Sequence, residues 1–557
     1  MIAIGLDAAD PELVEGWLAD GHLPNLARLR QRGGYGRLTN HEVYKAETPW
    51  TTFLTGCLPE TTGYWTPVRY VEGSYRIEEI EAYDFRRHPP FYALGPAYRV
   101  AIFDVPQTTL CSEVNGPQVL AWGAHSPQTP SHSQPPELLS EIQARYGEHP
   151  ALHRDHGDWW DSTYLKRLHG DLLTGIRRRT EICRDWLQQE RWDLFLTIFG
   201  ETHSAGHDFW HLSQKDHPLY GKSNQHFEVD PLLDVFRHVD QAIGEILAAA
   251  PEDAHVLIFS VHGSGQNVTD VPSMLFLPEF LYRFSFPGSM MLAPGSASGH
   301  VPPVETSVRS RHWQNEIWSR QQRSNPMHRT LRQRLPRRLH PNLDRWFGEG
   351  NPLPAIAELL EQGVPMSWQP PMWYSHLWPK MKAFALPSFS EGYIRLNVRD
   401  REPEGIVAPF DYDATCSELT TELMALRNPR NGQRVVKKVV RTRQSGSNQE
   451  PTLPAADLVV VWDDNAADVV DHPGLGRIGP VPYRRTGSHR ARGFWMLTGP
   501  GIGKNLSLRS GHAVDLAATV LDLMRAPPAA RLDGTSLLNA SPPTQSSAAS
   551  GSEFTQA

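Results

Sequence analysis

A short apolar segment, Leu194–Phe199, constrains the fold more than any other feature of this sequence. The segment stops at Gly200, and a short apolar run that a glycine interrupts predicts a buried strand ending in a loop. In open α/β sheets, active sites lie beyond the carboxyl ends of such strands. We therefore expect functional side chains among the residues that follow Gly200.

Histidines come directly after this predicted strand. His203 and His207 are four residues apart, so they would share one face if the segment after Gly200 is helical. Two imidazoles on one face can hold one transition metal, with zinc as the first candidate. An isolated pair of this kind more often caps or hydrogen-bonds a loop, so its interpretation depends on the rest of the chain.

Two other predicted strands also end at residues able to bind metals. The strand Met1–Leu6 is followed by Asp7, a carboxylate that either caps the next helix or ligates a metal. The strand His255–Ser260 runs into Val261, His262 and a glycine. A histidine therefore stands again at the carboxyl end of a buried strand.

A hydroxyl group stands at Thr48, just before Pro49–Trp50 and the start of a predicted helix. It is either the cap of that helix or a nucleophile at a helix N-terminus, where backbone N–H groups stabilise an oxyanion and a bound phosphate. This stretch alone leaves both alternatives open.

The composition excludes several classes of function. With 39% hydrophobic and 21% charged residues in 557, the chain is typical of a soluble globular protein. A net charge of −8 gives no general electrostatic case for nucleic acid or an anionic membrane. Four cysteines without CxxC spacing indicate neither a disulfide framework nor a cysteine zinc site. No leader-like segment or apolar run near membrane-spanning length is present, so a cytoplasmic location is our expectation.

The alternation of strands and helices is lost between residues 268 and 382, where Pro, Trp, Arg and Ser dominate. We expect an insertion or lid there, between a first core part at 1–267 and a second at 383–540. The Ser/Ala/Thr/Gln-rich tail at 541–557 is predicted to be disordered. The basic residues of the insertion would suit an anionic substrate, or form a solvated helical face or an oligomer contact. They are Arg309, Arg311, Arg320, Arg323, Arg329, Arg332, Arg334, Arg337, Arg338 and Arg345.

Five motifs in a fixed order carry a family resemblance. They are Asp7 after the first strand, Thr48–Pro49–Trp50 with Thr55–Gly56 and Pro59, Gly206–His207, His262–Gly263, and Gly487–Ser488–His489. The sequence resembles the alkaline phosphatase superfamily, nearest its type I phosphodiesterase/nucleotide pyrophosphatase branch. The runs at 391–407, 513–524 and 533–538 also resemble that branch.

The resemblance implies a three-layer α/β/α sandwich of alkaline-phosphatase type, interrupted by the Trp/Arg/Pro-rich insertion. It also implies two metals, usually zinc, about 4 Å apart. Asp7, Thr48 and His262 would belong to one metal. His203, His207 and His489 would hold the other. The expected cofactor is Zn²⁺, one or two ions per chain, with another divalent metal as the alternative.

Two ligand positions depart from the family pattern. Val261 stands where the family has an aspartate, and valine cannot ligate a metal. His203 replaces another aspartate, which leaves three imidazoles, a set known from catalytic zinc sites with an open position. Glu201, Asp208 and Asp464 are candidates to replace the lost carboxylate.

The nucleophile position departs as well. In many relatives the nucleophilic hydroxyl lies nine residues before the threonine of Thr55–Gly56, which corresponds to Ala46 here. Thr48 fits only with a two-residue deletion, and otherwise water attacks or the protein is not catalytic. Asp155–His156–Gly157 looks like a metal motif, but no predicted strand precedes it. The segment from Cys57 to Thr61 lacks the arginine of the sulfatase motif, which ranks a sulfatase low.

We therefore predict a metal-dependent hydrolase of phosphoric esters, of phosphodiesterase or nucleotide pyrophosphatase type. Thr48 or a metal-bound hydroxide would attack phosphorus. The alternatives are a catalytically inactive relative that binds an anionic ligand or partner, a sulfatase, and a phosphoryl transferase. We expect a small anionic phosphoester substrate, no nucleic acid polymer and no membrane, and we leave an oligomer open.

Overall fold

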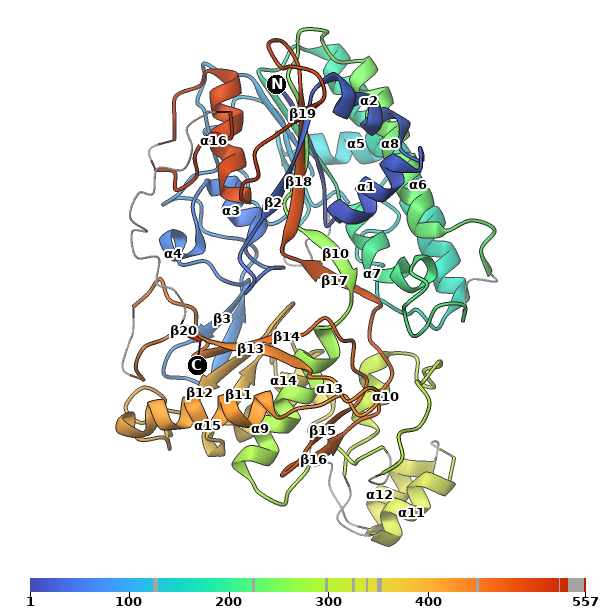
Figure 1. Cartoon of the computed structure of the whole chain (residues 1–557), viewed down its shortest axis with the longest axis vertical. Helices are drawn as coiled ribbons and strands as arrows, with labels where there is room; N and C mark the ends of the chain where they lie inside the picture. The colour runs from blue at the N-terminus through green and yellow to red at the C-terminus, as the bar shows by residue number, and fades with distance from the viewer. Residues whose placement is uncertain are drawn as a thin grey trace. The chain divides into compact units, whose positions relative to one another are not determined.

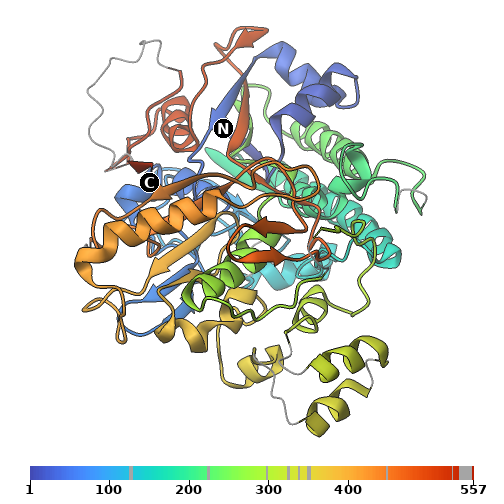
Figure 2. The same cartoon turned by 60° about the horizontal axis from the view of Figure 1, so that its bottom comes forward.

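The computed structural model of the chain (Figures 1 and 2) forms two compact units. The first comprises Met1–Pro67, Ile80–Asn267 and the described residues of 485–552, and the second comprises Val68–Glu79, Val268–Arg484 and the described residues of 553–557. The structure describes residues 1–123, 129–222, 226–295, 299–322, 326–336, 339–347, 353–446, 450–529, 531–538 and 555–556.

The first unit is built on a nine-stranded sheet with the order β19-β2-β18-β9-β1-β8-β5-β6-β7. Its central strand β1 (Ile2–Leu6) pairs in parallel with β8 (Leu194–Phe199) and β9 (Val256–Ser260). These three strands are buried along their whole length, as their continuous apolar sequences predict. The other strands are β2 (Gly34–Thr39), β5 (Val100–Phe103), β6 (Gln118–Leu120), β7 (His132–Gln134), β18 (Arg492–Thr498) and β19 (Leu506–Ser507).

Helices cover both faces of this sheet, which confirms the predicted α/β/α sandwich (Figure 1). Alternate residues of β1 point to opposite faces. Ile2, Ile4 and Leu6 belong to one apolar cluster, and Ala3 belongs to the other. The first cluster includes residues of α1 (Pro11–Ala19), α2 (Pro24–Arg32), α6 (Ser162–Gln189), α7 (Glu201–Ser213) and α8 (Pro231–Ala248). The second includes residues of α3 (Pro49–Thr55) and α16 (Ala513–Met524).

The segment 11–32, whose spacing predicts helix throughout, forms two helices instead. Gly21 adopts a φ of +76°, in the left-handed region that ends a helix, and Pro24 starts the next one. The backbone N–H groups of Asn25 and Leu26 donate to the carboxylate of Asp240 on α8, at 3.0 and 2.8 Å. A side chain distant in sequence therefore caps α2, which the local pattern does not reveal.

The second unit contains an antiparallel sheet with the order β11-β12-β14-β13-β20, and α15 (Tyr412–Met424) packs along β13 (Figure 2). The strands are β11 (Ala383–Leu386), β12 (Gly392–Leu396), β13 (Val436–Arg441), β14 (Leu458–Trp462) and β20 (Thr555–Gln556). Buried ion pairs hold this sheet. Arg395 contacts Glu402 at 2.6 Å, and Arg401 contacts Asp457 at 2.7 Å. Three of these four residues lie in the family-like run 391–407.

Strand pairing explains how the residues are divided between the two units. Residues 268–382 and 383–484 belong to the same unit, and residues 1–67 and 80–267 belong to the other. The reason is that β11 to β14 pair among themselves and not with the nine-stranded sheet. The hairpin β3 (Val68–Val71) and β4 (Arg76–Glu79) also belongs to the second unit, where the hydroxyl of Tyr70 donates to Glu402 at 2.6 Å.

The described residues of the segment 268–382 form short helices. They are a π-helix (Pro272–Phe276), α9 (Leu277–Ser285), α10 (Trp313–Trp318), α11 (Pro326–Arg334), α12 (His340–Phe347), α13 (Ile356–Glu361), α14 (Pro370–Trp373) and a 3₁₀-helix (Ser375–Lys380). Arg320 is used inside this unit, where it pairs with Glu305 at 2.8 Å and Glu316 at 3.1 Å. Arg323, Arg337, Arg338 and the tail from 541, apart from 555–556, lie outside the described residues.

The remaining elements are α4 (Pro59–Thr62), α5 (Leu138–Tyr146), β10 (Gly263–Gln266), β15 (Val470–His472), β16 (Gly476–Ile478), β17 (Gly487–Arg490) and a 3₁₀-helix (Pro409–Asp411). Every helix within the described ranges is too short or too polar to cross a bilayer.

Candidate metal centre

The histidine segment after β8 is helical. Helix α7 begins at Glu201, immediately after Gly200, so it starts at the carboxyl edge of the sheet. His203 and His207 are one turn apart on this helix and point the same way, with their Nε2 atoms 3.0 Å apart. The strand end and the helical period together therefore place two imidazoles side by side at this edge.

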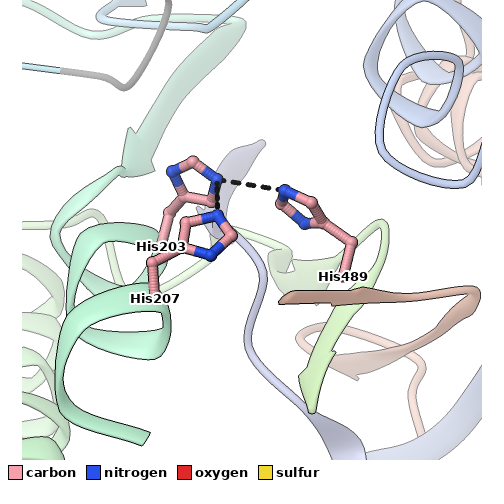
Figure 3. Close-up of side chains that lie close together, drawn as sticks. All are labelled: His203, His207 and His489. Carbon is pink, nitrogen blue, oxygen red and sulfur yellow. Dashed lines mark hydrogen bonds between the residues drawn. The ribbon is translucent and has the colours of Figure 1, made fainter. Parts of the chain in front are cut away.

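The third imidazole comes from β17, near the other end of the chain. Strand β17 pairs antiparallel with β10, which follows β9, and this register places His489 opposite Ser264. The Nε2 atom of His489 lies 3.3 Å from the Nε2 atom of His203 (Figure 3). The structure thus brings together three predicted ligands from α7 and β17, all within the first unit.

A close backbone approach positions β17 against α7. A Cβ atom added at Gly487 would lie 1.9 Å from the carbonyl oxygen of Gly206, so only glycine fits there. The Nδ1 atom of His207 donates to the carbonyl oxygen of Gly487 at 2.7 Å. Because a carbonyl only accepts, this bond puts the ring proton on Nδ1 and leaves the lone pair of a neutral ring on Nε2. His207 is therefore held in the tautomer that a metal ligand requires.

These three side chains fit a metal ion. They are nearly fully buried, with exposed fractions of 5%, 3% and 6% for His203, His207 and His489, and their ligand atoms lie within 4.8 Å of one another. Three nitrogens bound tetrahedrally to zinc at about 2.0–2.1 Å would be about 3.3 Å apart. Two of the three pairs, His203–His207 at 3.0 Å and His203–His489 at 3.3 Å, have separations close to that spacing. No other such group of His, Cys, Asp or Glu occurs among the described residues.

Asp7 and His262, predicted for the other metal, lie beside each other. Asp7 follows β1, His262 follows β9, and the Nε2 atom of His262 is 3.5 Å from Oδ1 of Asp7. The same Oδ1 accepts a hydrogen bond of 3.0 Å from the indole N–H of Trp50. Burial lowers the pKa of His262 to about 4, so the ring is neutral near pH 7. The His262 ring packs edge-on against His489, with centroids 4.7 Å apart.

The other two positions expected near this metal contribute no ligand in the structure. Val261 is fully buried in the apolar cluster of β9 and β18. Thr48 immediately precedes α3, but its side chain does not cap that helix. Its hydroxyl donates to the carbonyl oxygen of Tyr44 at 3.0 Å. The hydroxyl of Thr48 therefore bonds to the preceding turn and not to the first turn of α3.

Glu201 does not replace the lost carboxylate. Its Oε1 accepts from Arg179 and from His149, both at 3.1 Å, in a fully buried cluster. Burial alone would raise the pKa of Glu201, but Arg179 and His149 outweigh it, and the pKa lies below its ordinary value. Glu201 thus anchors the first turn of α7 to α6.

Asp208 does not replace it either. Asp208 accepts from the hydroxyl of Tyr164 at 2.7 Å, and burial raises the pKa of this carboxyl to about 7. Asp464 belongs to the second unit. His211, one turn after His207, contacts the hydroxyl of Thr486 at 3.1 Å, and burial lowers its pKa to about 3.

Sequence reasoning missed two neighbours of this site. The partner of Asp7 is Trp50, which the sequence presents only as part of a turn. Asp155, dismissed with its His-Gly motif, accepts from Ser204 on α7 at 2.8 Å. The backbone N–H groups of His156 and Gly157 donate to the hydroxyl of Tyr164, which itself donates to Asp208 on α7. The motif therefore stabilises the position of α7. No local pattern in the sequence signals either contact.

A buried set of three imidazoles at the carboxyl edge of a parallel sheet, inside an α/β/α sandwich, places the chain in the class of α/β hydrolytic folds with a candidate metal centre. Residues 1–345 match the model of the type I phosphodiesterase / nucleotide pyrophosphatase family. The chain therefore belongs to that family, a branch of the alkaline phosphatase superfamily, and is a hydrolase of the phosphodiesterase/phosphatase type. This confirms the resemblance and the enzyme class that the sequence motifs predict.

Among solved structures, the chain is similar to phosphonoacetate hydrolase from Sinorhizobium meliloti 1021. For the complex with phosphonoformate, the identity is 12% over 94% of this chain and 95% of that one, with a TM-score of 0.46. For the complex with phosphonoacetate, identity and coverage are the same and the TM-score is 0.43. No curated protein sequence matches the chain.

Proposed function

We propose that this chain is a metal-dependent hydrolase of phosphoric esters whose cation binds between His203, His207 and His489. The observation that carries the proposal is the convergence of their three Nε2 atoms from two elements distant in sequence. Three imidazole nitrogens can ligate one cation and leave a fourth position open to a further ligand. The substrate would be a small anionic phosphoester.

Zinc is the proposed ion, because three imidazole nitrogens in a tetrahedral arrangement suit it, and another divalent transition metal is the alternative. When bound, the ion would polarise a phosphoryl oxygen and lower the pKa of a coordinated water. The chain itself would hold the ion, keep bulk water away from it and fix the ring of His207 through Gly487. Asp7 lies beside this set through His262, which contacts Asp7 and packs against His489.

Metal removal tests the proposal. The purified chain would be stripped with a chelator, reloaded with zinc and assayed with bis(p-nitrophenyl) phosphate, p-nitrophenyl phosphate and p-nitrophenyl sulfate. We expect hydrolysis of a phosphate ester that disappears with the metal and returns with zinc. Preference for the sulfate would support a sulfatase instead.

Paired variants separate the metal site from the fold. His203→Ala and His489→Ala should lose both zinc and activity. His255→Ala, at the amino-terminal edge of β9, should keep both. Full activity in the two site variants would overturn the proposal. Metal-free wild-type protein that binds phosphate but hydrolyses no ester would support the inactive relative. Turnover in ¹⁸O-water without label in the phosphate product would support a transferase.

A further inference from the structure

We infer that this chain binds a single divalent cation, at the three imidazoles, and that the Asp7–His262 pair binds none. The inference rests on the proposed function, because it assumes that the three-imidazole site is loaded. It departs from the two-metal arrangement that the family resemblance implies. The structural reason lies at the four positions expected to bind the second cation. One of them, Val261, offers no ligand atom, and the other three, Asp7, Thr48 and His262, already make contacts within the protein.

The position of the missing aspartate is closed by packing. The side chain of Val261 is fully buried and lies in the same apolar cluster as Phe259 and Trp495. Its backbone is fixed too, because the side-chain amide of Asn40 donates to the carbonyl oxygen of Val261. No oxygen ligand is therefore offered from the residue before His262.

The hydroxyl position is engaged by its own turn. Both the hydroxyl and the backbone N–H of Thr48 donate to the carbonyl oxygen of Tyr44, at 3.0 and 3.1 Å. A threonine that ligates a metal or attacks phosphorus must give up its proton, whereas this one uses it in a buried hydrogen bond.

The remaining carboxylate, Asp7, already accepts a hydrogen bond from Trp50 where it would otherwise contact the cation. Asp7 is buried, and the indole N–H of Trp50, which can only donate, points its proton at Oδ1 from 3.0 Å. His262 contacts the same oxygen at 3.5 Å. Asp7 and His262 are thus two donors where a zinc site needs three from the protein. Trp50 acts as a positioning residue, because it holds Asp7, which in turn contacts the ring that packs on His489.

With a single cation, and with the hydroxyl of Thr48 already hydrogen-bonded to Tyr44, hydrolysis proceeds by a single displacement at phosphorus. A water oxygen forms the new bond to phosphorus while the bond from phosphorus to the leaving-group oxygen breaks with its electron pair. The proton that water loses ends on the leaving group or in the solvent. The configuration at phosphorus is inverted, and Thr48 never carries a phosphoryl group.

Metal counting distinguishes the two arrangements. The metal-free full-length chain would be titrated with zinc alone, and bound zinc would be counted by elemental analysis after gel filtration. We expect one zinc per chain in the wild type, one in Asp7→Asn and His262→Ala, and none in His203→Ala. Two zinc ions in the wild type, falling to one in Asp7→Asn, would overturn this inference and leave the proposed function intact. No zinc in the wild type would overturn both.

Two further readouts do not depend on titration. With Mn²⁺ in place of zinc, electron paramagnetic resonance should show an uncoupled ion, since a pair about 4 Å apart would be spin-coupled. Mass analysis of the acid-quenched enzyme during turnover should find no phosphorylated peptide containing Thr48, and Thr48→Val should retain hydrolysis. A coupled spectrum, or a phosphothreonine that disappears in Thr48→Val together with activity, would overturn the inference.

Discussion

The Nε2 atoms of His203 and His489 lie 3.3 Å apart although 286 positions separate them in the sequence. Helix α7 presents one of these residues, and β17, paired with β10, presents the other. The site therefore depends on how closely β17 packs against α7. A substitution that disturbs this packing should lower the affinity for the metal although it leaves the three histidines unchanged.

Gly487→Ala tests this packing. The new Cβ would meet the carbonyl oxygen of Gly206 at 1.9 Å, so β17 must move away from α7. We expect a loss of zinc affinity of about 10- to 100-fold, the range for disturbing the support of a metal ligand. Isothermal titration with zinc measures it. Gly170→Ala is the control, because nothing lies within 4 Å of its added Cβ, and it should bind zinc like the wild type.

Arg179→Met tests the anchor of α7. Arg179 is fully buried and contacts Asp104 at 2.7 Å and Glu201 at 3.1 Å, so its removal leaves two buried carboxylates without their cation. We expect a loss of about 3–5 kcal/mol in the free energy of opening, read from hydrogen exchange of β8 amides. Arg177→Met, on the same helix, removes an exposed pair with Glu181 and should cost less than about 1 kcal/mol. Equal costs in the two variants would contradict this role.

Asp457 gives the second unit a defined dependence on pH. Burial by itself would raise the pKa of this carboxyl, but the guanidinium of Arg401 outweighs it, and the pKa lies below its ordinary value. A depressed native pKa means that the stabilisation is present above the unfolded pKa of about 3.9 and is lost as the pH falls through the native pKa. Asp457→Asn should therefore cost about 3–5 kcal/mol at pH 7, because it removes the carboxylate that pairs with the buried guanidinium of Arg401, which then keeps only the carboxylate of Glu402, at 3.1 Å.

The difference between wild type and Asp457→Asn should be constant from about pH 7 to pH 5 and shrink below about pH 4. Hydrogen exchange of amides in β12 and β14 at several pH values measures it. A difference that grows on acidification would reverse the sign that we derive.

Zinc should stabilise the first unit, because the three imidazoles converge only in the folded chain. At zinc concentrations of about 100 times the dissociation constant, the gain should be about 2.7 kcal/mol. Thermal unfolding with and without zinc checks this, and the gain should vanish in His489→Ala. A stabilisation of the same size in that variant would place the zinc elsewhere.

Much of the first unit could be predicted from the sequence. The strands around Leu194–Phe199 and Ile2–Leu6 are continuous apolar runs, and the spacing of His203 and His207 is helical. These are local patterns, and the parallel sheet then brings the strand ends to one edge. His489 was placed by its motif, not by any local pattern, because its position depends on the pairing of β10 with β17.

The rest depends on contacts that join distant segments. The bond from Trp50 to Asp7 and the close approach of Gly487 to Gly206 exist only after the chain has folded. The sequence shows that residue 48 carries a hydroxyl. It does not show the hydrogen-bond partner of this hydroxyl, the carbonyl oxygen of Tyr44, because that is a backbone group which no sequence pattern identifies. The division of residues 11–32 into α1 and α2 is not visible in the sequence for a similar reason, because the side chain that caps α2, Asp240, comes from α8.

Anomalous diffraction at the zinc edge, from crystals of the zinc-loaded chain, tests the proposed metal centre most directly. We predict one zinc peak, bonded at about 2.0–2.1 Å to the Nε2 atoms of His203, His207 and His489. Crystals grown with zinc that show no peak between these three imidazoles would contradict the proposed function.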